Sequence, residues 1–123
     1  MTTFTQSILI VDDEFSLAET LAEILAWEGY VIRTAGNGHA ALLEMEQATP
    51  SLVLLDFMMP VMDGLDMLRS MRQRPGLERI PVILMTAAHM ALPPDERQYD
   101  ALLRKPFEVS AVLKLVRSLL GGE

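Results

Sequence analysis

The sequence predicts an α/β domain in which a doubly wound, five-stranded parallel sheet carries helices on both faces. Five short apolar runs, each bounded by polar or turn residues, alternate along the chain with segments of helical periodicity. The apolar runs show no polar alternation, so both faces of the sheet would be buried. Right-handed crossovers between parallel strands would place helices on both faces.

The five predicted strands are rich in Leu or in β-branched residues, which suit a buried, pleated surface. They cover residues 8–11, 30–32, 52–55, 81–85 and 101–103. Each run is too short for a helix that buries a face of its own, and each is followed by a polar residue or a turn.

The first helix is predicted between the first two strands. Apolar residues at i, i+4, i+7 and i+8 share one face: Leu17, Leu21, Ile24 and Leu25. Ser16 and Glu19 have the spacing of a capping box that would open the helix, and Gly29 would close it. Trp27 would be a partly buried anchor on this helix.

Three further helices are predicted over residues 38–47, 64–73 and 108–120. Residues 60–64 predict a turn followed by an N-cap for the second of these, with Asp63 in the capping position. Gly121 would stop the last one. The connection over residues 87–98 is unusual, because Pro93 and Pro94 leave room for at most a short helix near residues 95–99.

Length and composition limit the possible functions. The chain has 123 residues, half of them hydrophobic, with 17 Asp and Glu, 10 Lys and Arg and no Cys. One domain spanning residues 1–123 is expected, with no disulfide, thiolate metal site or Cys nucleophile. The net charge of −7 disfavours a nucleic-acid partner and an anionic membrane. No signal peptide and no run of 18 apolar residues is evident, so a cytoplasmic location is expected.

Acidic, hydroxyl and basic side chains follow four of the predicted strands. Asp12 and Asp13 follow the first strand, and Asp56 follows the third. Thr86 and Lys105 follow the fourth and the fifth. Ligands of open α/β sheets bind beyond the carboxyl ends of the strands, so these side chains are expected to converge on one site.

Three neighbouring carboxylates repel one another, and a hard divalent cation relieves that repulsion. Mg²⁺ suits such a set, because it takes carboxylates, a backbone carbonyl and several waters. Asp56, the central carboxylate, is a candidate nucleophile toward phosphorus. Mg²⁺ and Lys105 would supply the positive charge, and Thr86 would donate to a phosphoryl oxygen.

Four motifs occur in order along the chain. They are Asp12-Asp13 after Ile-Leu-Ile-Val, the segment Leu-Leu-Asp-Phe-Met-Met-Pro-Val-Met-Asp-Gly over residues 54–64, Thr86-Ala87 after Val-Ile-Leu-Met, and Lys105-Pro106-Phe107. In this order they resemble a response-regulator receiver domain of bacterial two-component signalling, of the single-domain chemotaxis type. The resemblance covers about residues 7–120 and implies a flavodoxin-like strand order of 2-1-3-4-5.

The resemblance implies a metal site and assigns its ligands. Asp13 and Asp56, with the backbone carbonyl of Met58, would hold Mg²⁺. Asp12 would assist through a water molecule. Mg²⁺ is the one cofactor expected.

The resemblance also implies a phosphoacceptor signalling module without enzymatic activity on other substrates. Asp56 would take a phosphoryl group from a phosphohistidine of a histidine kinase or a histidine phosphotransfer protein. Thr86 and Lys105 would contact that group, and a changed surface would then bind an unknown output protein. A monomer or a weak dimer is expected.

Two alternatives stay open at this point. An unphosphorylated pseudo-receiver would act as an interaction module alone, but such modules tend to lose one of the site residues that are intact here. A phosphatase with an Asp nucleophile would need a second acid two residues after Asp56, where this chain has Met58.

The chain departs from the family pattern near its output side. Receivers usually carry Tyr or Phe three residues before the lysine, and Leu102 stands at that position. We expect that the usual threonine–aromatic switch is missing, or that Tyr99 or another group replaces it. The span from Thr86 to Lys105 is also short and lacks the usual Gly-Ala turn, which predicts a shortened or mobile helix there.

Four arginines cluster around the predicted helix 64–73 and its exit: Arg69, Arg72, Arg74 and Arg79. A solvated face is the simplest interpretation, and a docking patch for a partner is the alternative.

Overall fold

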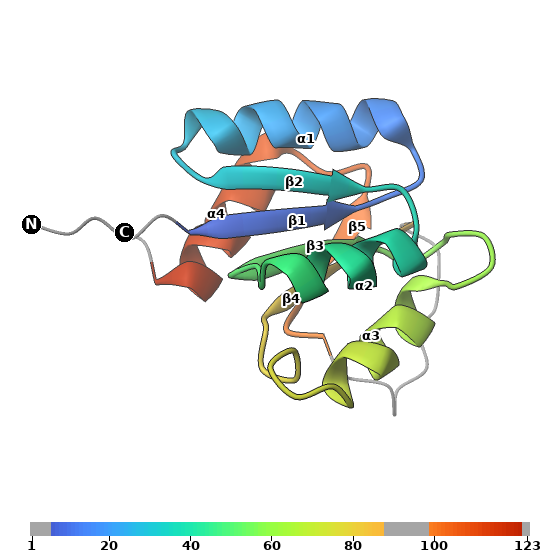
Figure 1. Ribbon diagram of the computed structural model, residues 1–123. Coiled ribbons are helices and arrows are strands. Elements are labelled where there is room, and N and C mark those ends of the chain that lie inside the picture. The colour runs from blue at the N-terminus through green and yellow to red at the C-terminus, as the bar shows by residue number, and fades with distance from the viewer. Residues whose placement is uncertain (1–5, 88–98, 122–123) are drawn as a thin grey trace, which may run out of the picture.

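The computed structural model describes residues 6–87 and 99–121, and it contains a parallel sheet of five strands in the order β2-β1-β3-β4-β5 (Figure 1). The strands are β1 (Ser7–Val11), β2 (Val31–Ala35), β3 (Leu52–Asp56), β4 (Val82–Ala87) and β5 (Ala101–Lys105). The predicted strands and their order are confirmed. All strands but β1 continue past the carboxyl end of the predicted run, and β2 and β4 begin one residue later than predicted.

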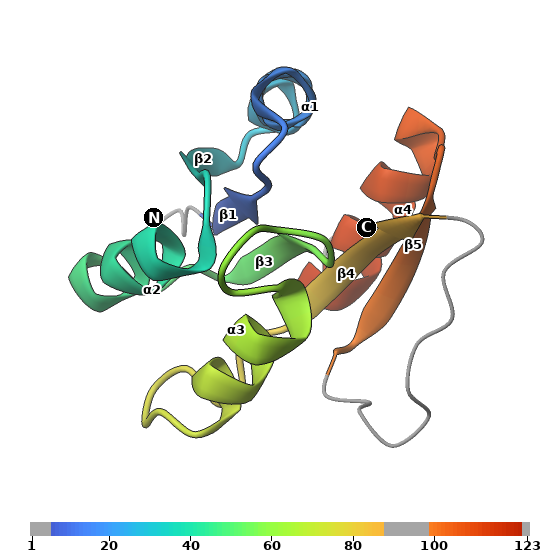
Figure 2. The ribbon, with the colours of Figure 1, turned by 90° about the vertical axis from the view of Figure 1, so that its right-hand side faces the viewer.

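Among the described residues, four helices cover the two faces of the sheet. They are α1 (Phe15–Trp27), α2 (Gly38–Gln47), α3 (Gly64–Arg72) and α4 (Val109–Leu120). Helices α1 and α4 lie on one face, and α2 and α3 lie on the other (Figure 2).

The buried side chains form two cores, one on each side of the sheet, because successive residues of a strand point to opposite faces. In β3, Val53 and Leu55 join the core beneath α2 and α3. Leu52 and Leu54 join the core beneath α1 and α4. The sheet is therefore buried on both faces along its central strands, as the unbroken apolar runs predict.

The two edge strands differ from that expectation. Residues of β2 and β5 are mostly half-buried or exposed, and Val31 is 49% exposed. Each of these strands has a neighbour on one side only and lies at the margin of the helical layers. The prediction of complete burial was therefore wrong for β2 and β5.

Helix α1 begins earlier than predicted. Its N-cap is Glu14, whose side chain makes no capping hydrogen bond, and Ser16 lies inside the first turn. The capping box was therefore wrong: the Asp12 carboxylate accepts from the Glu14 backbone N–H at 2.8 Å and turns the chain into the helix there. Gly29 follows the C-cap at a φ of +102°, as predicted.

Trp27 is 89% exposed, so its predicted role as a partly buried anchor was wrong. The buried face of α1 consists of Ala18, Leu21 and Leu25. Trp27 lies two residues after Leu25, which is roughly 200° away around a helix, and it therefore faces solvent.

Helices α2 and α3 have the caps that their sequences favour. Asn37 accepts from the Ala40 backbone N–H at 2.8 Å. Asp63 accepts from the Asp66 backbone N–H at 2.9 Å, which confirms the predicted N-cap of α3.

Arg72 and Asp100 join the exit of α3 to the start of β4 and β5. The Asp100 carboxylate accepts from the Val82 backbone N–H at 2.8 Å and from the Arg72 guanidinium at 3.1 Å. Arg72 also donates to the backbone oxygens of Glu78 and Ile80, at 3.0 and 2.7 Å. Arg72 therefore has a structural role, because it connects α3 to the segments before β4 and β5. Arg69 and Arg74 instead pair with Asp66 and Glu46 at the surface.

The short helix expected near residues 95–99 falls almost entirely outside the described residues. Tyr99, at its end, is described and belongs to no helix. Within residues 6–87 and 99–121, no helix combines the length and the apolar character needed to cross a membrane.

Candidate functional site

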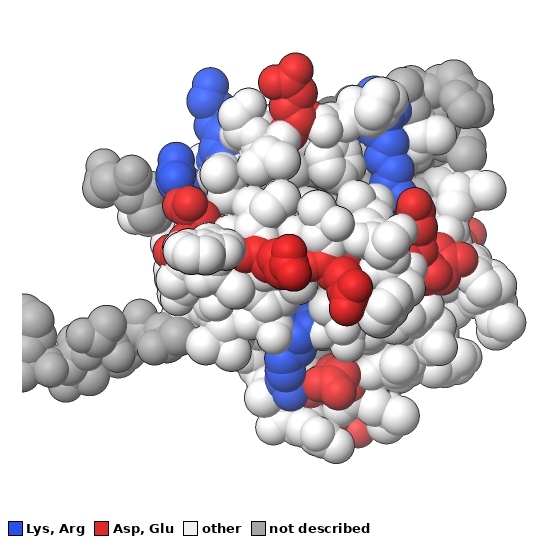
Figure 3. Space-filling view, turned by 90° about the horizontal axis from the view of Figure 1, so that it is seen from above, with Lys and Arg blue, Asp and Glu red and all other residues white. Residues whose placement is uncertain are grey.

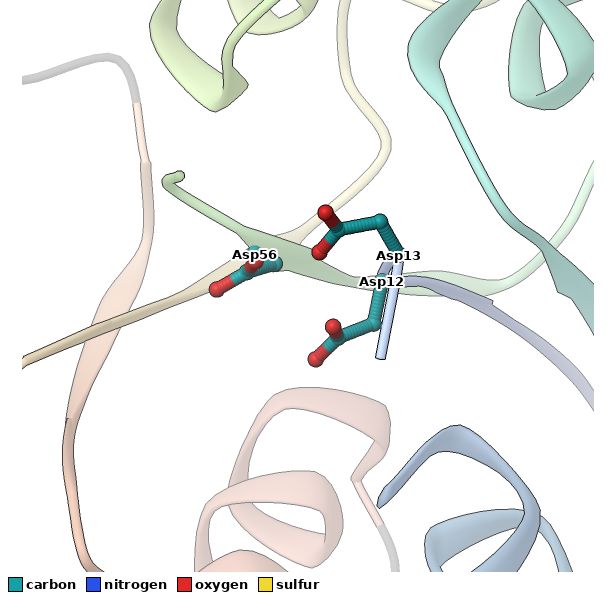
Figure 4. A group of neighbouring side chains, drawn as sticks. All are labelled: Asp12, Asp13 and Asp56. Carbon is teal, nitrogen blue, oxygen red and sulfur yellow. The ribbon is translucent and has the colours of Figure 1, made fainter. Parts of the chain in front are cut away.

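The carboxyl ends of β1 and β3 bring three carboxylates together. The two strands are neighbours, and Val11 pairs with Leu55, so the residues that follow them, Asp12 and Asp56, lie side by side. Figure 4 shows Asp12 and Asp13 leaving the end of β1, with Asp56 across from them at the end of β3. One carboxylate oxygen from each of the three lies within 4.8 Å of the others.

Strand β5 delivers Lys105 to the same edge of the sheet. Its ammonium nitrogen lies 3.2 Å from Asp56 Oδ1 and 3.5 Å from Asp12 Oδ2. Thr86 reaches this edge on β4, one residue after Met85, which pairs with Asp56. The predicted site residues of all four strands therefore end at one edge of the sheet.

The site is largely removed from solvent. Asp12, Asp56 and Thr86 are the buried polar residues of the described chain, at 2%, 5% and 1% exposure. Two buried side-chain oxygens of the described residues lack a hydrogen-bond partner: Asp12 Oδ2 and Thr86 Oγ1. Both belong to this site, and a buried polar atom without a partner is costly, so the site is shaped for a further group.

Burial is the largest cause that raises the pKa of both buried carboxyls. The pKa of Asp56 is raised to about 6, mainly by burial and then by the charge of Asp12, although Lys105 lowers it. Burial raises the pKa of Asp12, while the Glu14 N–H and Lys105 offset only part of the effect. Burial alone would lower the pKa of Lys105, but the charges of Asp12 and Asp56 outweigh it and raise that pKa.

The turn after β3 holds Asp56 in place through a close backbone approach that sequence reasoning missed. The Gly64 backbone N–H donates to the Phe57 oxygen at 2.8 Å. A Cβ atom at Gly64 would lie 2.6 Å from the Asp56 backbone oxygen and 2.9 Å from Phe57 Cα. Only glycine fits there; the Asp-Gly pair at residues 63–64 signals a turn but not this approach.

The loop between β3 and α3 carries exposed apolar side chains beside the carboxylates. Met58 is 58% exposed and Val61 is 93% exposed. Val61 has a φ of +70°, an unfavourable value for a β-branched residue. Met58 and Asp13 line one shallow hollow of about 450 Å³. The site is therefore open to an incoming group beside Asp13 and Met58.

The donor atoms fit a hard divalent cation. Three carboxylate oxygens converge within 4.8 Å, and neither Cys nor His belongs to the cluster. Such a set favours Mg²⁺ or a similar ion over softer metals. Asp12 Oδ2, which is buried without a hydrogen bond and has Lys105 as an ion-pair partner at 3.5 Å, has capacity to accept from a further group.

A family model described as "Response regulator receiver domain" matches residues 8–117. The chain belongs to this family. The receiver fold and the phosphoacceptor signalling role that the sequence predicts are therefore confirmed, and nothing in the comparisons favours the pseudo-receiver.

Curated relatives of this receiver domain are transcriptional regulators. It is 38% identical over 121 residues to the probable transcriptional regulatory protein TcrX of Mycobacterium tuberculosis, covering 93% of this chain and 49% of TcrX. It is 37% identical over 123 residues to the DNA-binding response regulator MtrA of the same species, covering 98% and 53%. The chain thus spans about half the length of these relatives.

Solved structures place the receiver domain among chemotaxis regulators and other response regulators. It resembles CheY4 of Vibrio cholerae with a TM-score of 0.86 and 25% identity, covering 95% of this chain and all of that one. It resembles TrrA of Thermotoga maritima, solved in complex with Mg²⁺ and BeF, with a TM-score of 0.85 and 33% identity, covering 94% and 100%.

The expectation that no nucleic acid is involved was wrong. It rested on the net charge of this chain, but relatives that match it over half of their length include proteins named as DNA-binding. In a protein with a separate output region, the charge of the receiver half does not decide what the other half binds. An acidic receiver is therefore compatible with a nucleic-acid partner.

Proposed function

We propose that Asp56 is the phosphoacceptor of this receiver domain. The observation that carries the proposal is the position of Asp56 between Lys105 and the carboxylates of β1, with the unpartnered hydroxyl of Thr86 on the neighbouring strand. A carboxylate oxygen of Asp56 attacks the phosphorus of a phosphohistidine. The new O–P bond forms as the P–N bond breaks, and the electron pair stays on the imidazole nitrogen.

Lys105 and Thr86 act on the transferred group. Lys105 first holds the Asp56 carboxylate and then offers its positive charge to a phosphoryl oxygen, since its ammonium carries three donors. Thr86 Oγ1 donates its proton to another phosphoryl oxygen, which would satisfy the buried hydroxyl. Lys105 would thus exchange a contact inside the protein for one to the phosphoryl group, whereas Thr86 would gain its first partner there.

Asp12, Asp13 and Asp56 would hold Mg²⁺, with the backbone carbonyl of Met58 as a further ligand. The ion would neutralise the carboxylates and withdraw charge from the phosphoryl oxygens. Asp12, which is held by Glu14 and Lys105, would orient a water of the ion, whereas the exposed Asp13 would bind it directly.

The reactions of the domain are limited to its own carboxylate. It takes the phosphoryl group from a sensor kinase or a phosphotransfer protein, and water later attacks the phosphorus and returns the carboxylate and inorganic phosphate. These partners fit a cytoplasmic location. Because Met58 occupies the place of a general acid, the site is not expected to turn over foreign substrates.

Intact-mass measurement after incubation with acetyl phosphate and Mg²⁺ tests this proposal. We expect a mass gain of one phosphoryl group, absent in Asp56→Asn and retained in Asp66→Asn, a matched change on the exposed first turn of α3. A mass gain retained in Asp56→Asn would exclude Asp56 as the acceptor. If neither the unchanged chain nor any variant gains mass, and Mg²⁺ does not bind, the pseudo-receiver would be favoured.

A further inference from the structure

The outer side of α1 carries an exposed band of side chains that the phosphoacceptor site does not use. The band consists of Phe15, Glu19, Glu23 and Trp27, which recur every four residues and are neighbours on a helix surface. Phe15 is 71% exposed and Trp27, the one tryptophan of the chain, is 89% exposed. Aromatic side chains this exposed are typical of protein–protein contacts.

A groove runs beside this band, between α1 and the edge strand β2. It has a volume of about 500 Å³, and Ala22 and Ile32 give it an apolar floor. Phe15, Glu19 and Glu23 line the same groove, and a second hollow joins Glu23 to Trp27. The band and the groove thus form one continuous surface.

The charge of this surface is one-sided. A row of acidic side chains crosses α1 in the view from above (Figure 3). Glu19 and Glu23 are exposed, and none of the ion pairs found among the described residues reaches them. Arg33, the basic residue of the groove, pairs with Glu44 at 2.8 Å and is thereby neutralised. The carboxylates of Glu19 and Glu23 are therefore not neutralised by a cation of this surface.

We propose that the α1 band and its groove bind a basic amphipathic helix of a partner protein. Two Lys or Arg side chains of that helix, one turn apart, would pair with Glu19 and Glu23. Its apolar side chains would cover Trp27 at one end and enter the groove over Ile32 at the other. The interaction does not depend on phosphorylation of Asp56.

The two components of the surface would contribute differently. The exposed aromatic rings supply most of the area removed from water and act as anchors. The carboxylates select a basic helix over an acidic one and speed up the encounter, and this part weakens with salt. Binding should therefore be sensitive both to ionic strength and to loss of the indole.

Fluorescence anisotropy with a labelled peptide tests the proposal. The probe is an 18-residue helical peptide of Leu and Ala on one face with two Lys four residues apart on the other. A second peptide carries Glu in place of Lys. We expect the basic peptide to bind the full chain with a Kd below about 100 µM at low salt and the acidic one to bind at least about tenfold more weakly, with Trp27 emission shifted to the blue.

Variants locate the contact. Trp27→Ala should weaken binding about fivefold or more, and Glu19→Gln with Glu23→Gln about tenfold. Leu43→Ala and Glu108→Gln, exposed matched changes on α2 and before α4, should leave the Kd within about twofold. Asp56→Asn should bind like the unchanged chain, which separates this test from that of the phosphoacceptor.

Three outcomes would overturn the proposal. One is a Kd above about 1 mM for the basic peptide. Another is equal weakening by the control variants. The third is sedimentation showing a dimer that Trp27→Ala disrupts, because the band would then bind a second copy of this chain.

Discussion

The ammonium nitrogen of Lys105 lies 3.2 Å from Oδ1 of Asp56, although the two residues are 49 positions apart in the sequence. This pair joins β5 to β3 across the intervening strand β4. It places a positive charge against the carboxylate whose pKa burial and Asp12 raise to about 6.

Replacing Lys105 by Met should raise the pKa of Asp56 further above its ordinary value, because the charge and the hydrogen bond that lower it are lost. The rate of phosphorylation should fall about a hundredfold, since a donor to the phosphoryl group is removed. Carbon-13 NMR titration of the Asp56 carboxyl measures the pKa. Lys114→Met, at an exposed position of α4, is the matched control, and an unchanged pKa of Asp56 in Lys105→Met would contradict the expectation.

The stability of the protein should fall as the pH rises through the range in which Asp56 ionises. The pKa of Asp56 is about 6 in the folded protein and 3.8 for an unperturbed aspartate, so the folded form binds more protons between these values. The Asp56 contribution to the free energy of unfolding is therefore complete below about pH 4 and lost above about pH 6, with a size of up to about 3 kcal/mol.

Asp56→Asn tests that dependence, because an amide does not ionise. Urea unfolding at pH 4 and pH 7.5 should show the variant more stable than the unchanged chain at the higher pH, with the difference largely gone at the lower one. Asp66→Asn, whose carboxyl is exposed, should show no such pattern. A variant that is less stable at pH 7.5 would show that the Asp56 carboxylate is satisfied in the folded state.

Millimolar Mg²⁺ should raise the melting temperature, since a ligand that binds the folded form stabilises it. The rise should be larger at pH 7.5 than at pH 5, because protonation of Asp56 and Asp12 competes with the metal. Calorimetric melts with Mg²⁺ or with EDTA measure it. Asp13→Asn should reduce the shift strongly and Asp63→Asn should not; equal shifts in both would place the ion elsewhere.

Gly64→Ala should cost about 1–3 kcal/mol of unfolding free energy and also slow phosphorylation, because its Cβ would press on the backbone of Asp56. Gly38→Ala is the matched control. Its Cβ would lie 2.6 Å from Met62 Sδ and would press on a flexible side chain, not on backbone. Urea unfolding compares the two variants, and a similar cost for both would remove the special role of Gly64.

Leu102 should keep its rotamer when the domain is activated. It is half-buried and packs against the core beneath α2 and α3, and it has no ring to follow a movement of Thr86. Methyl NMR of the domain with and without beryllofluoride and Mg²⁺ checks this. A large Leu102 rotamer change that tracks Thr86 would restore the usual switch.

The strands, and the convergence of the candidate site residues, could be predicted from the sequence for a physical reason. Apolar runs mark buried strands, and the residues that follow Val11, Leu55 and Met85 must then meet at one sheet edge. Asp56 after an apolar run is costly unless it has a partner or a function, so it stands out from the sequence alone.

Other features depend on contacts that no local pattern contains. The predicted capping box does not form, because the Asp12 carboxylate accepts from the Glu14 N–H and the helix begins there. Trp27 was predicted to be a partly buried anchor, although its position around the helix points outward. The close approach of Gly64 to Asp56 requires the turn itself, and the exposure of β2 and β5 depends on their places at the edges.

The tie between Arg72 and Asp100 has a consequence for the fidelity of strand pairing. Strand β5 is an edge strand, and Asp100 fixes its beginning against Val82. A slip of one residue would turn every side chain of β5 to the opposite face, and Arg104 would take the place of Lys105. If the contact between Arg72 and Asp100 were lost and β5 mispaired, the domain would no longer be phosphorylated, although every residue of the phosphoacceptor site would still be present in the sequence.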